Sequence, residues 1–290
     1  MKRAVALGAA TIIVIAAAVL WQQLPGIGAG ALLYPSRHAA AGGPPAGCAD
    51  TAFAGAGVTL RGWTCTPPGA VRGTIVYLHG NANHHGSATG VIQRFLPRGF
   101  RVVAYDSRAQ GVSGGEVCTY GFYEKADLRR VIDTLPAGPV VLMGSSLGAA
   151  VALQEAADDP RVTTVVAAET FSDLRTVATE RAPFVFTRGS IDRAFALAEQ
   201  LAHFRVDEVS PMRAAARIKA PVLLIHGAAD VNTPPSHSER VRAALTSPSE
   251  LILVPGAGHN QSLNGAGVWN RIEAWIDRAI DGRRMTTPIT

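Results

Sequence analysis

The chain has 290 residues, of which 48% are hydrophobic and 17% are charged, so it can bury a large core and has no signature of intrinsic disorder. The formal net charge is +5, but the basic residues are spread singly and no aromatic platform accompanies them, which excludes a nucleic-acid-binding function. Three cysteines, none in a Cys-x-x-Cys pattern, exclude a disulfide-rich scaffold and a cysteine-ligated metal site.

The first segment is an uncharged, apolar run from Ala4 to Trp21 that follows Lys2 and Arg3. A helix of about 20 residues crosses a bilayer. A cleaved signal peptide has a shorter apolar region closed by a small-x-small site, and no such site directly follows this run. We therefore expect residues 1–24 to form an uncleaved transmembrane signal anchor, although cleavage would give a secreted protein. Because basic residues stay in the cytoplasm, the remainder is expected outside it, in the periplasm or at the cell surface.

Residues 25–46 are rich in Gly, Ala and Pro and predict a flexible linker to one domain over residues 47–290. That domain is expected to begin with two short strands around a glycine-rich turn. A two-residue turn at Ala56-Gly57 places Cys48 opposite Cys65. Directly opposed residues are close enough for a disulfide in an oxidising compartment, and two free, buried thiols are the alternative.

Further along the chain, short β-branched runs alternate with segments of helical spacing. This pattern is typical of an α/β fold with a mostly parallel central sheet and helices on both faces. The expected strands cover residues 73–79, 101–105, 140–143, 162–167, 222–226 and 251–254. The expected helices cover residues 88–96, 123–135, 147–157, 191–201, 235–245 and 268–280.

The segment from about Phe171 to Lys219 interrupts this alternation. Its position before a strand predicts a short helical insert that caps an active site, with ordinary crossover helices as the alternative. Its apolar cluster supplies Phe184 and Phe186 as candidates for lining a substrate pocket.

Gly144-Ser-Ser-Leu-Gly148 carries the strongest functional signal because it lies between an expected strand and an Ala-rich helix. A sharp strand-to-helix turn crowds the backbone, so glycines must flank the serine, which is exposed at the top of the sheet. Ser146 is therefore expected to be a nucleophile at a helix N-terminus, where developing negative charge is stabilised. A glycine-rich turn with a serine N-cap is the alternative.

A serine nucleophile needs a base to take its proton and a carboxylate to orient that base, in the chain order Ser, acid, His. Asp230 follows the expected strand 222–226, and His259 follows the strand 251–254 in a glycine-rich loop. Both stand just past the carboxyl end of a strand, where catalytic groups gather in open α/β sheets. We predict Asp230 as the orienting acid and His259 as the base.

An oxyanion hole requires backbone N–H donors close to the nucleophile. One is expected from Leu147, the residue after the nucleophile, and the other from Asn81, where the preceding Gly80 permits close approach. His84 and His85 have no third metal ligand nearby at a usable spacing, so we expect solvated loop residues and no metal site.

From about Gly47 onward the chain resembles the α/β-hydrolase superfamily, and within it the membrane-anchored serine hydrolases of the Bem46 and ABHD13/17-like group. The matching stretches are His79-Gly-Asn81, Tyr105 to Gly114, Gly144 to Gly148, Val222 to Asp230 and Gly256 to His259. Ala109 departs from the group's pattern, which usually has glycine there. The resemblance implies hydrolysis of an ester, thioester or amide through an acyl-enzyme, without a cofactor.

Four other residues have secondary interpretations. Asp106 precedes the nucleophile in the chain, which favours a structural role in its turn over that of the triad acid. Glu169 and Asp173 follow the strand after the nucleophile, a position from which some hydrolases take an alternative acid. Cys118 lies in a loop near the strand ends, where it lines the pocket or packs in the core.

Hydrolysis of a small-molecule ester is the expected function, and a peptidase or acyltransferase would use the same triad. A membrane-anchored domain that binds a ligand without turnover is the alternative from another class, because a fold does not set a function. The complete triad and both oxyanion loops argue against it, since a binding module needs none of them.

Overall fold

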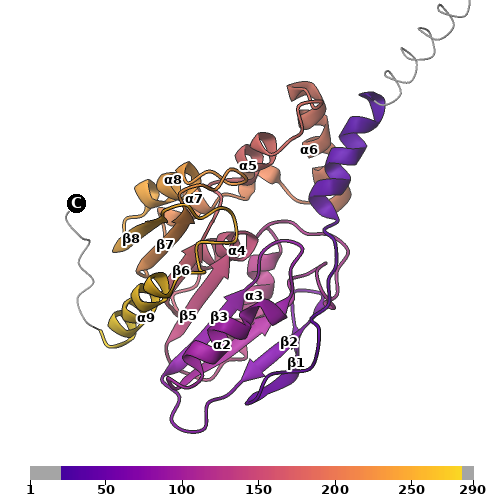
Figure 1. Ribbon diagram of the computed structural model, residues 1–290. Helices are drawn as coiled ribbons and strands as arrows, with labels where there is room; N and C mark the ends of the chain where they lie inside the picture. The colour runs from indigo at the N-terminus through magenta and orange to yellow at the C-terminus, as the bar shows by residue number, and fades with distance from the viewer. Residues whose placement is uncertain (1–20, 283–290) are drawn as a thin grey trace, which may run out of the picture.

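The computed structural model describes residues 21–282, whose strands form one eight-stranded sheet in the order β1-β2-β4-β3-β5-β6-β7-β8 (Figure 1). The β1–β2 and β2–β4 pairs are antiparallel, and the other pairs are parallel. The strand bounds are β1 Cys48–Ala54, β2 Thr59–Cys65, β3 Gly73–Leu78, β4 Phe100–Tyr105, β5 Val140–Ser145, β6 Val162–Ala168, β7 Val222–Gly227 and β8 Ser249–Val254.

Helices cover both faces of this sheet and enclose two apolar cores. One core lies under α2 (Thr89–Phe95) and α9 (Ala266–Ile280), and the other lies under α3 (Glu124–Asp133), α4 (Leu147–Ala156), α7 (Pro211–Ala215) and α8 (Ser236–Ala244). Within β3, Ile75 belongs to the first core and Val76 to the second. Successive residues of a strand face opposite sides, so a strand covered on both faces needs a continuous apolar run. The predicted α/β architecture is confirmed.

The hairpin at the edge of the sheet carries a disulfide. The backbone N–H of Gly55 donates to the carbonyl of Val58 at 2.8 Å, which closes the turn between β1 and β2. In the resulting register Cys48 lies opposite Cys65, and the two are joined by a disulfide.

The segment between β6 and β7 forms a cap of short helices at the carboxyl ends of the strands. It contains α5 (Leu174–Glu180), α6 (Arg188–Ala202) and a short 3-10 helix η2 (Val206–Glu208), after which α7 returns to the face of the sheet. Side-chain caps start α5 and α6, because Asp173 accepts from the N–H of Thr176 and Thr187 accepts from that of Ser190. Figure 1 shows α6 standing apart from the helices that cover the sheet. The helical insert expected before the acid-bearing strand is therefore present.

The N-terminal part of the described chain differs from the expected linker over residues 25–46. Residues 21–33 form a helix, drawn in indigo in Figure 1, and Leu24, Ala29 and Leu33 on it are buried. Ala29 and Leu33, one helical turn apart, belong to the apolar cluster of the cap, so this face of the helix packs onto the cap. The anchor expected over residues 1–24 lies outside the described residues except for residues 21–24, which belong to this helix. Among residues 21–282, no helix is both long and apolar enough to cross a bilayer.

Candidate active site

The turn from β5 into α4 holds Ser146 in a strained conformation, with φ 51° and ψ −112°. A non-glycine residue rarely adopts such a positive φ. The two flanking glycines are required by space: a Cβ on Gly144 would lie 2.4 Å from the carbonyl carbon of Gly148, and one on Gly148 would lie 2.1 Å from the carbonyl oxygen of Leu78. The N–H of Ser146 donates to the carbonyl of Ala168 at 2.8 Å. Although Ser146 is largely buried, this crowded turn places it at the start of α4, where it lines a polar cavity.

Three side chains from separate loops meet at this turn. His259 Nε2 lies 3.1 Å from Ser146 Oγ, and His259 Nδ1 lies 2.6 Å from Asp230 Oδ2. The carboxylate accepts from Nδ1–H, which leaves Nε2 free to accept from the serine hydroxyl. A base within hydrogen-bond reach of a serine, itself oriented by a carboxylate, is the geometry that activates a serine nucleophile.

The carboxylate of Asp230 is held from its other side by the loop after β7. The backbone N–H groups of Asn232 and Thr233 each donate to Asp230 Oδ1 at 2.9 Å. The buried ring of His226 places Nε2 3.3 Å from Asp230 Oδ2 and 2.8 Å from the carbonyl of Thr233. Sequence analysis missed His226, although a polar residue inside an apolar strand is a usable signal because a buried imidazole needs partners. It ties the loop that carries the acid to β7.

The loop that carries His259 rests on the buried side chain of Glu169. Its carboxylate accepts backbone N–H groups from Asn260 at 2.6 Å, Gln261 at 3.1 Å and Ser262 at 3.0 Å. Glu169 therefore supports the loop, whereas Asp230 makes the carboxylate contact with the imidazole. The other alternative acid, Asp173, caps α5, as described above.

The loop after β3 brings its backbone close to the nucleophile. A Cβ on Gly80 would lie 3.6 Å from the Cβ of Ser146, and the side chain of Gln110 fixes the loop by accepting the N–H of Ala82 at 2.7 Å. Leu147 is the first residue of α4, where backbone N–H groups lack intrahelical acceptors. The predicted donors, Asn81 and Leu147, thus stand on the two segments that flank Ser146. Gln110 is a second residue that sequence analysis missed.

Asp106 anchors the far end of the same loop, and here one expectation is wrong. His85 is buried rather than solvated: its N–H donates to Asp106 Oδ1 at 2.6 Å, and its ring Nδ1 lies 2.8 Å from the same oxygen. The N–H of Val112 donates to Asp106 Oδ2 at 2.8 Å. Burial raises the pKa of Asp106, but these hydrogen bonds outweigh it and the pKa is lowered overall. Asp106 therefore has the structural role expected from its position.

The loop after Asp106 shows why glycine is usual where this chain has Ala109. Ala109 has φ 60°, a left-handed conformation that glycine adopts without a steric penalty. Its N–H donates to the carbonyl of Gly114 at 2.8 Å, which closes the loop in spite of the strained residue.

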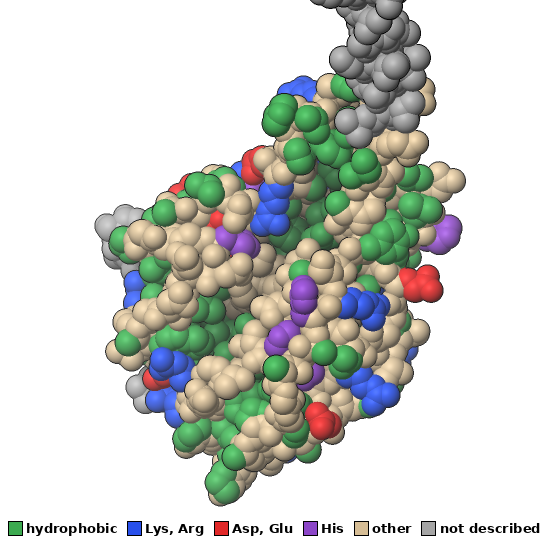
Figure 2. All heavy atoms as spheres, turned by 45° about the vertical axis from the view of Figure 1, so that its right-hand side comes forward, with side chains coloured by type: hydrophobic (Ala, Val, Ile, Leu, Met, Phe, Trp, Pro, Cys, Tyr) green, Lys and Arg blue, Asp and Glu red, His purple; other side chains and the backbone are tan. Residues whose placement is uncertain are grey.

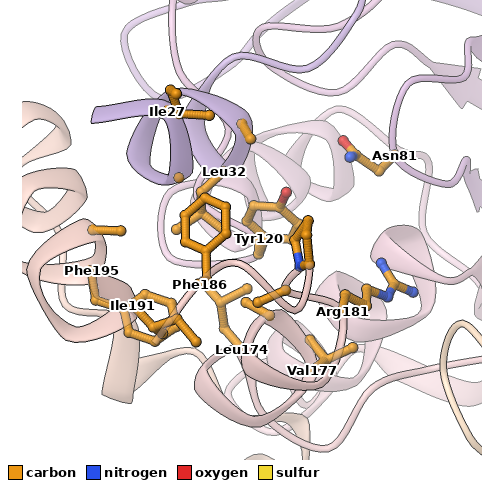
Figure 3. Close-up of a pocket in the computed structure, with 16 residues that line it drawn as sticks. Ile27, Leu32, Asn81, Tyr120, Leu174, Val177, Arg181, Phe186, Ile191 and Phe195 are labelled. Carbon is orange, nitrogen blue, oxygen red and sulfur yellow. The ribbon is translucent and has the colours of Figure 1, made fainter. Parts of the chain in front are cut away.

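Two adjoining cavities lie at the triad. A polar cavity of about 610 Å³ is lined by Ser146 and His259, and an apolar cavity of about 360 Å³ lies beside it. Asn81 and Arg181 line both. Figure 2 shows hydrophobic side chains gathered around a hollow on this face, and Figure 3 shows the apolar cavity with these two residues at one side. Apart from them, the side chains labelled in Figure 3 are Ile27, Leu32, Tyr120, Leu174, Val177, Phe186, Ile191 and Phe195.

The structure separates the three expected pocket residues. Phe186 lines the apolar cavity. Phe184 does not line it, because its side chain is 98% exposed on the loop before α6. Cys118 is also not a lining residue: it is fully buried in the core under α3 and α4, and this burial raises the pKa of its thiol. Both corrections follow from the direction of a side chain, which a loop sequence does not reveal.

Arg181, at the junction of the two cavities, is a third residue that sequence analysis missed. Its Nε donates to the carbonyl of Asn232 at 2.8 Å, and its guanidinium also donates to the hydroxyl of Thr233. Burial lowers its pKa. Arg181 thus ties the end of α5 to the loop that carries Asp230.

A mostly parallel sheet with a strained serine turn and a Ser–His–Asp contact defines the α/β-hydrolase class. The sequence profile of the Alpha/beta hydrolase family matches residues 75–268, and the chain belongs to this family.

Curated relatives cover most of the chain. The uncharacterized protein YqkD of Bacillus subtilis is 28% identical over 229 residues, which span 71% of this chain and 70% of that protein. The alpha/beta hydrolase domain-containing protein aho-3 of Caenorhabditis elegans is 27% identical over 227 residues, or 75% of this chain and 61% of that protein.

Solved structures share the fold. The esterase Pf2001 of Pyrococcus furiosus superposes with a TM-score of 0.65 at 21% identity, over 87% of this chain and 99% of that one. An acetyl xylan esterase from Paenibacillus sp. R4 gives a TM-score of 0.62 at 21% identity, over 91% of this chain and 93% of that one. The fold is therefore that of an α/β-hydrolase, and the family supports hydrolase activity.

Proposed function

We propose that the protein is a serine hydrolase that cleaves an ester bond of a small molecule through an acyl-enzyme on Ser146. The observation that carries this proposal is the unbroken contact chain from Ser146 Oγ through His259 to Asp230, at 3.1 and 2.6 Å. Two of the solved structures that share the fold are named as esterases, which favours an ester substrate.

In the proposed reaction, Ser146 Oγ attacks the substrate carbonyl while His259 Nε2 takes its proton. Asp230 stabilises the imidazolium that forms. The N–H groups of Asn81 and Leu147 bind the oxyanion, where each such donor typically contributes about 10²–10³-fold in kcat. His259 then gives its proton to the leaving alcohol, and the acyl group stays on Ser146. Water, deprotonated by His259, releases the acid and regenerates the serine.

A peptidase or acyltransferase would use the same residues, and one neighbour with this fold is named as an acylaminoacyl peptidase. The apolar lining of the cavity beside the triad favours an acyl chain over a polar peptide. Binding without turnover is disfavoured because a binding site needs neither a strained serine nor an oriented imidazole.

We also propose that the protein is membrane-anchored, as the Bem46 and ABHD13/17-like resemblance implies, and that its hydrolase domain is extracytoplasmic. The apolar run Ala4 to Trp21 behind Lys2 and Arg3 supports an anchor, and the Cys48–Cys65 disulfide supports an oxidising compartment. Protease treatment of cells whose outer layers are permeabilised and whose cytoplasmic membrane is intact tests this placement: digestion of the domain is expected, and full protection together with a soluble cytoplasmic fraction would contradict it.

The function is tested on the full chain in mild detergent with a fluorophosphonate probe, followed by mass spectrometry of the labelled peptide. We expect an adduct on Ser146, loss of the adduct and of hydrolysis in Ser146→Ala, and retention of both in the matched control Ser145→Ala. A folded protein that neither labels nor hydrolyses any ester would refute the proposal and favour the binding module.

A further inference from the structure

The helix of residues 21–33 forms one wall of the apolar cavity. Ile27, Gly28, Ala31 and Leu32 line the cavity from this side, opposite side chains of the cap such as Leu174 and Phe195 from α5 and α6. Figure 3 shows Ile27 and Leu32 on this helix, with the ring of Phe186 beside it. A segment that precedes the hydrolase sheet in the chain thus contributes to the space beside the nucleophile.

This wall is fixed to the rest of the protein. A Cβ on Gly28 would lie 2.9 Å from the Cβ of Ala194 and 3.1 Å from a ring carbon of Phe186, so helix and cap are in close contact. The carbonyl of Leu33, which is fully buried, accepts the N–H of Cys118 at 2.9 Å. Beyond the helix, the guanidinium of Arg37 donates to the carbonyl of Ser113 at 2.9 Å. Because these contacts hold both the helix and the segment after it, the wall has a defined position.

The apolar cavity also adjoins the polar cavity that contains the triad. Asn81, the proposed oxyanion donor, lines both this cavity and the polar cavity that contains Ser146 and His259. An acyl group on Ser146 places its carbonyl oxygen at Asn81, so the carbon chain beyond the carbonyl has an apolar space directly beside it. A chain that enters this space removes apolar surface from water, at about 25 cal/mol per Å².

We propose that the helix of residues 21–33 is a specificity element, which selects esters with an extended apolar acyl chain by forming the outer wall of the acyl pocket. This inference rests on the proposed function. Residues 21–24, the end of the expected anchor, lie within this helix, so the same stretch of chain that would lead from the membrane shapes the pocket for an acyl chain.

Two glycines of the helix provide a matched test. Gly28 faces Ala194 and the cavity, whereas a Cβ on Gly26 would meet nothing within 4 Å. Both substitutions replace a helical glycine, so Gly28→Leu and Gly26→Leu differ mainly in what the new side chain touches.

The full chain is assayed on p-nitrophenyl acetate and p-nitrophenyl octanoate, with melting temperature measured for each variant. Relative to wild type, Gly28→Leu is expected to lower kcat/KM for octanoate about 10-fold or more and to change the acetate value less than about 2-fold. Gly26→Leu is expected to change neither.

A second cavity variant keeps the test decisive if Gly28→Leu fails to fold. Ala31 is exposed and lines the cavity, so Ala31→Phe fills the pocket without entering the core, and the same selective loss on octanoate is expected. Equal losses on both esters, unchanged octanoate activity in both cavity variants, or a wild type that accepts only acetate would overturn the inference while the hydrolase function stands. Absence of hydrolysis and of Ser146 labelling in the wild type would instead remove the proposed function, and the inference with it.

Discussion

Glu169 supports the base from behind: its Oε2 accepts the backbone N–H of Asn260 at 2.6 Å, and Asn260 directly follows His259. Asn260 has φ 64°, so the chain turns sharply at this point and needs external support. The backbone N–H groups of the next two residues, Gln261 and Ser262, donate to the other carboxylate oxygen, so Glu169 holds the loop at three successive positions.

Glu169→Gln is expected to lower kcat by about 10-fold, with a smaller change in KM. The amide presents an N–H₂ group to backbone donors that need an acceptor, so the loop shifts and the imidazole leaves its productive position. Steady-state kinetics on a soluble ester and the labelling rate of Ser146 measure the effect. Asp173→Asn, at the cap of α5, is the comparison, and an equal fall in kcat there would show that both act only through the stability of the fold.

Asp230→Asn is expected to reduce kcat by about 10⁴-fold while the domain remains folded. An amide cannot stabilise the imidazolium and favours the wrong tautomer of His259. Its Oδ1 still accepts the N–H groups of Asn232 and Thr233, so the loop keeps its support. Kinetics and circular dichroism check the prediction, and near wild-type turnover would mean that another group orients the base.

Gln110→Leu is expected to lower kcat by about 10- to 100-fold, because the N–H of Ala82 loses its acceptor and the neighbouring Asn81 loses its fixed position. Gln110→Glu keeps an acceptor at the same place and should retain more activity. The ordering of the two variants in kcat is the measurement. Equal activities in both would separate this side chain from oxyanion binding.

Asp106→Asn is expected to lower the stability of the fold at neutral pH and to lower it less at acidic pH. The fold lowers the pKa of this carboxyl, so its ionised form stabilises the native state above the ordinary value of 3.8, and the contribution is lost as pH falls toward the lower folded value. Melting temperatures of wild type and variant should therefore differ at pH 7 and converge as pH falls below about 4. A pH-independent gap would show that the charge of Asp106 is not the stabilising factor.

Removal of the disulfide is expected to cost stability without much effect on catalysis. The bond joins residues 17 positions apart, and a loop of about 15 residues is stabilised by about 3 kcal/mol through restriction of the unfolded chain. The hairpin lies at the β1 edge of the sheet, away from the triad loops after β5, β7 and β8. Urea unfolding of the double variant Cys48→Ser/Cys65→Ser measures the loss of stability. The kcat of the same variant, compared with wild type, measures the effect on catalysis.

Local features of the sequence predicted the elements and the order of the triad. The expected strand 222–226 is observed as Val222–Gly227, and the expected helix 123–135 as Glu124–Asp133. Buried strands and amphipathic helices each have a characteristic pattern of hydrophobic residues, so their positions can be predicted from the sequence. The nucleophile turn is legible too, because only glycine fits at positions 144 and 148.

The tertiary structure decided everything that depends on contacts between distant segments. A glycine-rich stretch predicted a linker, yet residues 21–33 fold as a helix because the cap, more than 150 positions later around Ala194, offers Gly28 a surface for close packing. Phe184 and Phe186 are two positions apart, and only one faces the cavity. His85 is buried because Asp106 comes from the neighbouring strand end to meet it. Periodicity along a chain indicates which residues are apolar and which element they form. Which of these side chains become buried depends on the element that packs against them. The residues that line the proposed pocket could therefore be identified only from the tertiary structure.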